Sequence, residues 1–131
     1  MASRLTEVII DCRDLDHMVG FWRAALGYEE VSRGDTWVAL GPPGDKVTDE
    51  KLRASALAPA VALVLVPEPK TVKNRVHVDL TPIDRAQPNE VERLVALGAS
   101  RVDIGQRETP WVVMADPEGN EFCVMPELGR E

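Results

Sequence analysis

Two four-residue segments decide the fold that we predict: Trp37-Val38-Ala39-Leu40 and, later in the chain, Trp111-Val112-Val113-Met114. A second pair of matching segments, Ala25-Leu26-Gly27 and Ala96-Leu97-Gly98, recurs at almost the same spacing. Asp14 and Asp84 supply a third match. Three matches in the same order indicate an internal duplication with a period of roughly 70 residues. One copy alone would expose an apolar sheet face, so pairing two copies is the expected way to bury it.

Each copy is expected to run strand, helix and then three further strands. In the first copy Asp14 is a suitable N-cap and Gly27 a suitable stop for a helix whose apolar residues recur every three or four positions. In the second copy Pro88 opens a helix that Gly98 ends. The polar, Ala-rich residues 45–59 are expected to form the longest irregular stretch, apart from one helical turn. The expected strands cover residues 8–10, 28–32, 36–40, 61–66, 75–81, 99–104, 111–115 and 121–125.

Composition excludes several classes of protein. The chain has 131 residues and a net charge of -7, which disfavours binding to nucleic acid or to an anionic membrane. No segment approaches the roughly 20 apolar residues that span a bilayer, and the first residues become charged before an apolar leader could form. Cys12 and Cys123 are the two cysteines, too few to indicate a disulfide framework. We therefore expect a cytoplasmic protein with two reduced thiols.

Three segments carry a resemblance to a known family. The first is Asp11-Cys12-Arg13-Asp14 leading to Phe21-Trp22-Arg23-Ala24-Ala25-Leu26-Gly27-Tyr28, the second is the segment from Pro67 to His77, and the third is Asp116-Pro117-Glu118-Gly119-Asn120-Glu121-Phe122. Together with the duplication they make the chain, from about Leu5 to Pro126, resemble the glyoxalase-like branch of the glyoxalase/bleomycin-resistance/dioxygenase superfamily, also called the vicinal-oxygen-chelate superfamily.

The resemblance implies an α+β fold in which two tandem βαβββ modules form a curved, mostly antiparallel sheet cleft. We expect a single glyoxalase-like domain over residues 1–131, with one module at about 5–66 and the other at about 74–126. The superfamily includes lyases, isomerases, dioxygenases and metal-free antibiotic-binding proteins, so the fold alone does not select an activity.

Metal-using members of the superfamily place four ligands on strands of both modules. The resemblance puts Glu7 and His77 at the first ligand position of each module and leaves Val64 and Cys123 for the other two. Valine has no lone pair, and cysteine is a soft donor that suits zinc better than iron or magnesium. We therefore expect no bound metal and no cofactor.

The polar lining of the cleft then supplies the candidate site residues. We predict His77 and Glu7 as catalytic, because neighbouring carboxylates could tune a histidine for acid/base work. The alternation of side chains along a strand adds Asp11 and Asp79, with Glu121 as a further candidate. The predicted ligand-binding residues are Asp11, Trp37, Asp79, Trp111 and Cys123.

Five of these residues also have a structural interpretation that the sequence leaves open. Glu7 could be an exposed carboxylate at a strand edge, and His77 could make a structural hydrogen bond. Trp37 and Trp111 could pack in the core rather than against a ligand, and Cys123 could be a small buried apolar residue.

The resemblance implies that the protein binds a small organic ligand in the sheet cleft without a catalytic metal. The alternative is a lyase, isomerase or dioxygenase with a non-standard Glu/His/Cys site or metal-free acid/base chemistry. A fold that serves only for dimerisation is a third possibility. We expect a homodimer, with no nucleic-acid or membrane partner.

Overall fold

The computed structural model describes residues 2–44, 47–54 and 58–129. The chain divides into two compact units, Met1–Pro69 and Lys70–Glu131. The boundary falls between the two predicted modules. That both modules act as one domain with a shared cleft stays a prediction. Within the described ranges, no helix is both long and apolar enough to cross a membrane.

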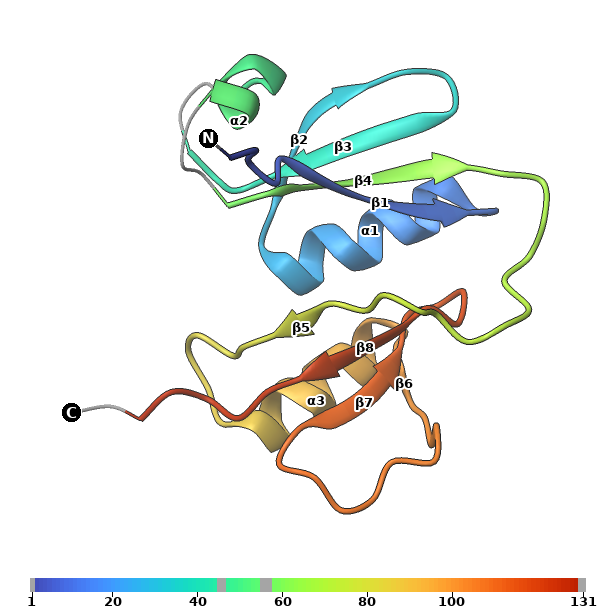
Figure 1. Cartoon of the computed structure of the whole chain (residues 1–131), viewed down its shortest axis with the longest axis vertical. Helices are drawn as coiled ribbons and strands as arrows, with labels where there is room; N and C mark the ends of the chain where they lie inside the picture. The colour runs from blue at the N-terminus through green and yellow to red at the C-terminus, as the bar shows by residue number, and fades with distance from the viewer. Residues whose placement is uncertain (1, 45–46, 55–57, 130–131) are drawn as a thin grey trace. The chain divides into compact units, whose positions relative to one another are not determined.

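Each unit contains the predicted strand, helix and three further strands (Figure 1). The first unit has β1 (Glu7–Cys12), α1 (Leu15–Leu26), β2 (Glu29–Arg33), β3 (Trp37–Gly41), α2 (Asp49–Ala54) and β4 (Ala60–Leu65). The second has β5 (Asp79–Leu80), α3 (Gln87–Leu97), β6 (Ser100–Arg101), β7 (Val112–Ala115) and β8 (Glu121–Val124).

The two sheets have the same topology. Their strand orders are β1-β4-β3-β2 and β5-β8-β7-β6. In each sheet the first strand pairs in parallel with the last, and the other two pairings are antiparallel. The α+β class and the mostly antiparallel βαβββ module are therefore confirmed. The second unit's outer strands, β5 and β6, are much shorter than the predicted 75–81 and 99–104.

Helix α1 forms for the reasons read from the sequence. The side chain of Asp14 accepts a hydrogen bond from the backbone N–H of His17 at 3.2 Å, which satisfies one of the free donors of the first turn. Gly27 ends the helix with a left-handed φ of 65°, a conformation that costs glycine little. Met18, Phe21, Trp22 and Ala25 form its buried face.

Helix α3 departs from the expected equivalence with α1. Asp84 does not cap it, because the N-cap is Ala86, and the Asp84 carboxylate instead contacts Arg85. Val95 of α3 is exposed, whereas Glu90 is buried. Arg93 makes two hydrogen bonds to the Glu90 carboxylate, at 2.7 and 2.8 Å, and so supplies the partner that a buried charge needs.

The strand pairings define which residues of the two units correspond. Asp79 is the counterpart of Ile9 when the repeats are aligned on Asp14 and Asp84. Ile9 lies opposite Ala62 in the first sheet, and Asp79 lies opposite Cys123 in the second. The counterpart of Cys123 is therefore Ala62 rather than the Val64 that the sequence comparison selected. Alanine, like valine, has no lone pair to offer a metal.

The two faces of the first sheet differ in what covers them. Helix α1 packs on one face, where Val38, Leu40 and Leu63 are fully buried. Helix α2 lies on the other side of the sheet in Figure 1. That second face carries the outward residues of β1, including Glu7, and is the face on which the site is built.

Candidate functional site

A pocket of about 460 Å³ lies on this second face of the first sheet. Strand residues form its floor and one wall, and α2 forms the opposite wall. The lining residues are Thr6, Glu7, Trp37, Ala39, Asp49, Leu52, Arg53, Ala60 and Ala62. Two of them, Glu7 and Trp37, are site residues predicted from the sequence. The pocket therefore brings together residues from β1, β3, β4 and α2.

The floor of the pocket consists of alanines on adjacent strands. Ala39 of β3 lies opposite Ala62 of β4, and Ala60 of β4 lies opposite Glu7 of β1. All three alanines are buried, so their methyl groups are the only side-chain volume at these positions. Small side chains on neighbouring strands leave a depression that larger residues would fill. No local sequence pattern indicated this depression.

Trp37 stands at the start of β3 with about a third of its surface exposed. Its indole lies directly against Gly34 in the turn between β2 and β3. A Cβ added to Gly34 would come within 2.7 Å of Trp37 Cε2 and closer still to Nε1. Any other residue at position 34 would therefore push the indole away. Gly34 is a positioning residue for the aromatic wall of the pocket.

Three ionisable side chains line the same pocket: Glu7, Asp49 and Arg53. Glu7 is an exposed residue, yet partial burial of its carboxyl group raises the pKa of Glu7, and the negative charge of Asp49 raises it further. Asp49 also accepts a hydrogen bond from the Ser32 hydroxyl at 3.2 Å. Across the described ranges, the carboxylate of Glu7 and the guanidinium of Arg53 have neither an ion pair nor a side-chain hydrogen bond.

The residues contributed by α2 were not expected to belong to the site, because residues 45–59 were predicted to be largely irregular. Five of those residues, 45–46 and 55–57, lie outside the described residues. A usable signal was present in the sequence: Thr48 precedes two acidic residues, as at a helix start. The Thr48 hydroxyl accepts a hydrogen bond from the backbone N–H of Lys51 at 3.2 Å.

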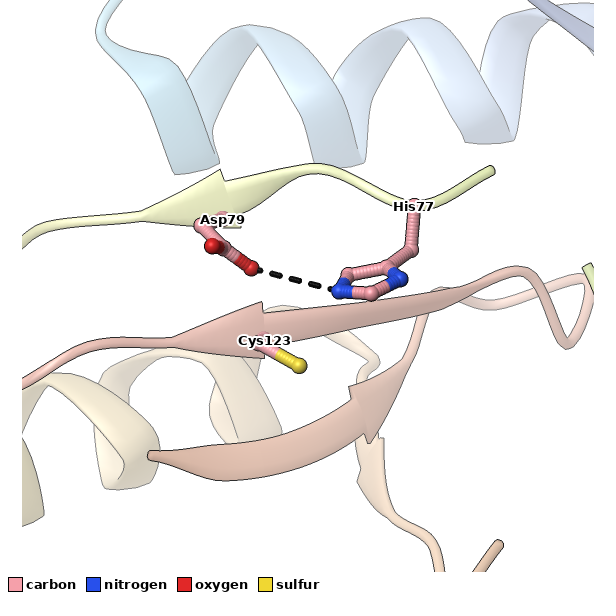
Figure 2. A group of neighbouring side chains, drawn as sticks. All are labelled: His77, Asp79 and Cys123. Carbon is pink, nitrogen blue, oxygen red and sulfur yellow. Dashed lines mark ion pairs between the residues drawn. The ribbon is translucent and has the colours of Figure 1, made fainter. Parts of the chain in front are cut away.

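The second unit brings together three other predicted residues, His77, Asp79 and Cys123 (Figure 2). His77 Nε2 lies 3.4 Å from Asp79 Oδ1, and donor atoms from all three residues lie within 4.8 Å of one another. His77 and Asp79 are about half exposed, whereas Cys123 is buried. Burial and the nearby Asp79 raise the pKa of the Cys123 thiol, an effect that Lys73 opposes only in part. The thiol is therefore protonated at neutral pH.

The remaining candidates do not join either group. Asp11 is exposed at the far end of β1 from Glu7 and does not line the pocket. Trp111 precedes β7 and is partly exposed, with its carbonyl accepting a hydrogen bond from Thr109. Their ligand-binding roles stay predictions, as do those of the other named site residues.

The carboxylate of Glu121 is held by hydrogen bonds within the second unit. Its carboxylate accepts hydrogen bonds from Lys70 at 2.9 Å and from the backbone N–H of Asn74 at 3.0 Å. Burial alone would raise the pKa of Glu121, but these contacts outweigh it and lower the pKa. Glu121 therefore holds the segment that precedes β5 against β8, which accounts for its carboxylate without a ligand.

Comparison with known proteins places the chain in a family. The model of the glyoxalase-like domain family matches residues 7–125. The chain belongs to this family. A search of curated proteins found no significant match.

Solved structures support the same fold for this glyoxalase-like chain. A glyoxalase/bleomycin resistance protein/dioxygenase family enzyme from Burkholderia phytofirmans is 18% identical, with a TM-score of 0.65 over 94% of this chain and 97% of that one. The fosfomycin resistance protein FosX from Listeria monocytogenes, with Mn(II) and sulfate bound, is 14% identical, with a TM-score of 0.70 over 98% and 93%. The trypanothione-dependent glyoxalase I of Leishmania major is 12% identical, with a TM-score of 0.62 over 96% and 88%. At these identities the likeness shows the fold alone.

Because one of these structures contains manganese, the donors of this chain can be tested against such an ion. On the pocket face of the first sheet, Glu7 faces Ala60 and its neighbour Ala62, which have no lone pairs. In the second unit the donors that lie together are His77, Asp79 and Cys123, and the cysteine sulfur is a soft ligand. Manganese prefers carboxylate, carbonyl and water oxygens in octahedral geometry. This group of three donors does not fit a hard ion of that kind.

Proposed function

We propose that this glyoxalase-like protein binds a small organic molecule in the pocket of its first unit, without a resident metal ion. The observation that carries the proposal is the pocket of about 460 Å³ between the first sheet and α2. Its volume lies within the roughly 300–1,000 Å³ range of small-molecule sites.

The lining supports a binding role because it combines apolar contact with a few polar groups. The alanine floor and Trp37 offer apolar surface, while Glu7, Asp49 and Arg53 converge on the same space from two sides. Sites for small molecules have this composition, in which the apolar surface supplies affinity and the polar groups fix orientation.

The first test is a thermal-shift screen of small acidic, basic and aromatic metabolites against the full chain and its Trp37→Ala variant. A ligand at 100 times its dissociation constant should stabilise the protein by about 2.7 kcal/mol. Trp37→Ala should weaken binding of any hit about tenfold, because an aromatic wall contributes roughly 1–1.5 kcal/mol.

Two further variants sharpen this test. Gly34→Ala should weaken binding in the same direction, because it displaces the indole without removing it. Ile83→Ala removes an apolar side chain that is 92% exposed and lies outside the pocket, so it should leave affinity unchanged. Full affinity retained in the Trp37→Ala protein would contradict this location for the site.

The second candidate function is an enzyme: a lyase, isomerase or dioxygenase of the same superfamily. The cluster of His77, Asp79 and Cys123 favours it, because a carboxylate beside a histidine can orient the ring for proton transfer. Metal analysis of the purified protein, with no metal added, tests the metal-using form of the enzyme candidate. The binding function predicts less than stoichiometric metal, and one ion per chain would favour the enzyme.

We also propose that the chain forms a homodimer in the cytoplasm. Free, buried Cys12 and Cys123 are consistent with a reducing compartment, and Val76 and Ile83 leave apolar surface exposed. Light scattering at tens of micromolar should return twice the 14.4 kDa mass of one chain. A value equal to one chain would contradict the dimer.

A further inference from the structure

We infer that the pocket of the first unit selects a small organic cation with a flat ring, whose ammonium group sits beside Glu7 and Asp49 while the ring lies against Trp37. This inference rests on the proposed function and specifies its ligand class. Neither the family match nor the similar structures assign such a ligand to this chain.

The charges of the lining carry the first step. Two carboxylates, Glu7 and Asp49, and one guanidinium, Arg53, line the pocket, so its lining has an excess of one negative charge when all three are ionised. No side-chain partner of Glu7 is found in the described parts of the chain, and Asp49 has only the Ser32 hydroxyl. A partly desolvated carboxylate without a partner is destabilised, and an ammonium ion is the group that would relieve it.

The position of Glu7 supports the same conclusion. Its carboxylate is partly desolvated and is also repelled by Asp49 across the pocket. A cation between the two carboxylates would offset both effects at once, because it is attracted to each and screens one from the other. A neutral ligand would leave the repulsion in place, and an anion would add to it.

Trp37 supplies the complementary contact for the ring. An indole face attracts cations within about 6 Å of its centre, and it stacks on flat apolar groups. The contact between this indole and Gly34 fixes the indole at the pocket wall before any ligand arrives. A cation held between an indole and two carboxylates therefore gains from both kinds of contact.

Arg53 does not make the pocket an anion site. Its guanidinium has no ion pair within the described segments, but an anion that reached it would also approach Glu7 and Asp49. Two repulsive contacts against one attractive contact disfavour that mode of binding. Arg53 instead limits how much positive charge the pocket accepts, which favours a single ammonium group.

The experiment uses three probes that share an indole ring and differ in charge: tryptamine is cationic, tryptophol neutral and indole-3-acetate anionic. Each is titrated at pH 7 into the ¹⁵N-labelled full chain, and the Trp37 indole N–H is followed by NMR after assignment with Trp37→Phe. Tryptamine should bind about tenfold more tightly than indole-3-acetate, with tryptophol between them, since each charge contact is worth up to about 1 kcal/mol.

Two variants assign the selectivity to the pocket. Glu7→Gln keeps the shape of the side chain and should weaken tryptamine about fivefold while leaving tryptophol unchanged. Glu50→Gln is the matched control, because Glu50 lies on the same α2 helix but does not line the pocket. It should leave all three affinities unchanged.

The pH dependence gives an independent readout. A proton on Glu7 competes with the bound cation, so tryptamine affinity should fall as the pH drops from 7 through the raised pKa of Glu7. Asp49 and Arg53, both from α2, line the pocket with Glu7, and the guanidinium of Arg4, which donates to the Arg53 carbonyl at 3.1 Å, is a further charge beside it. Glu7→Gln should flatten this pH profile, and a profile unchanged by the substitution would count against the inference.

The outcomes separate this inference from the function on which it rests. If indole-3-acetate or tryptophol shifts the Trp37 signal most strongly, the charge preference is wrong while ligand binding in the pocket stands. If none of the three probes shifts that signal at millimolar concentration, the inference is overturned. The proposed function itself fails only if the metabolite screen also yields no Trp37-dependent ligand.

Discussion

Trp22→Ala should lower the free energy of unfolding by about 3–5 kcal/mol, the range typical of a large aromatic residue removed from a core. Trp22 is only 2% exposed and lies on the buried face of α1. Its ring meets that of Phe21 edge-on, with centroids 5.2 Å apart and planes at 86°, an arrangement that adds to simple burial. Urea denaturation followed by circular dichroism measures the change.

The matched control is the same substitution at Trp37, which is 37% exposed. Trp37→Ala should cost about 1 kcal/mol, because much of its side chain is already in contact with water. Trp22→Ala should mainly lower stability, because Trp22 lies in the core between α1 and the sheet. Trp37→Ala should mainly lower ligand affinity, because Trp37 lines the pocket on the other face. A loss below about 1 kcal/mol for Trp22→Ala would contradict the assignment of Trp22 to the core.

Asp116→Ala should lower the free energy of unfolding by about 2–4 kcal/mol, because it removes several hydrogen bonds to one buried carboxylate. Asp116 is 3% exposed at the turn between β7 and β8. It accepts from the backbone N–H of Glu118 at 3.0 Å and of Asn120 at 2.9 Å, and from the Asn120 side-chain amide at 2.9 Å. Alanine would leave these donors without their partner.

Asp103→Ala is the matched control for this prediction. Asp103 also accepts a backbone hydrogen bond in a turn, from Gly105 at 2.8 Å, but the bond is exposed to solvent and water can replace it. Its loss should cost less than about 1 kcal/mol. Thermal and urea unfolding of the two variants should therefore differ clearly, and equal losses would show that the Asp116 network is not buried in solution.

Local sequence signals correctly predicted the features that depend only on residues close together in the chain, namely the ends of α1 and the order of elements in each unit. The periodicity and caps of α1 are local, so Asp14 and Gly27 marked its ends correctly. The repeated segments predicted two βαβββ units because each copy encodes the same order of elements. Helix α2 was expected only as one helical turn somewhere in residues 45–59, because a helix of six residues is too short to show a hydrophobic period.

Buried polar residues were harder to predict, since burial of a charge depends on a partner. Glu90 reads as a surface residue of α3, yet it is buried because Arg93 pairs with it. Glu121 similarly reads as a candidate for the cleft lining, but Lys70, far earlier in the chain, occupies its carboxylate. The Lys70–Glu121 pair is fixed by the fold and leaves no mark in the sequence around either residue, whereas the i,i+3 spacing of Glu90 and Arg93 on one helix was a local signal.

The sequence by itself determined the duplicated α+β fold and indicated that Glu7 and Trp37 belong to a site. Only the tertiary structure decided that they line one pocket, because that depends on β4 lying between β1 and β3. It also decided that Ala62, rather than Val64, matches Cys123. The register of a strand is set by pairing with distant residues, so the two-residue difference between Ala62 and Val64 could not be read from the sequence around either one. The shape and charge of the pocket follow from that pairing, which no local pattern specifies.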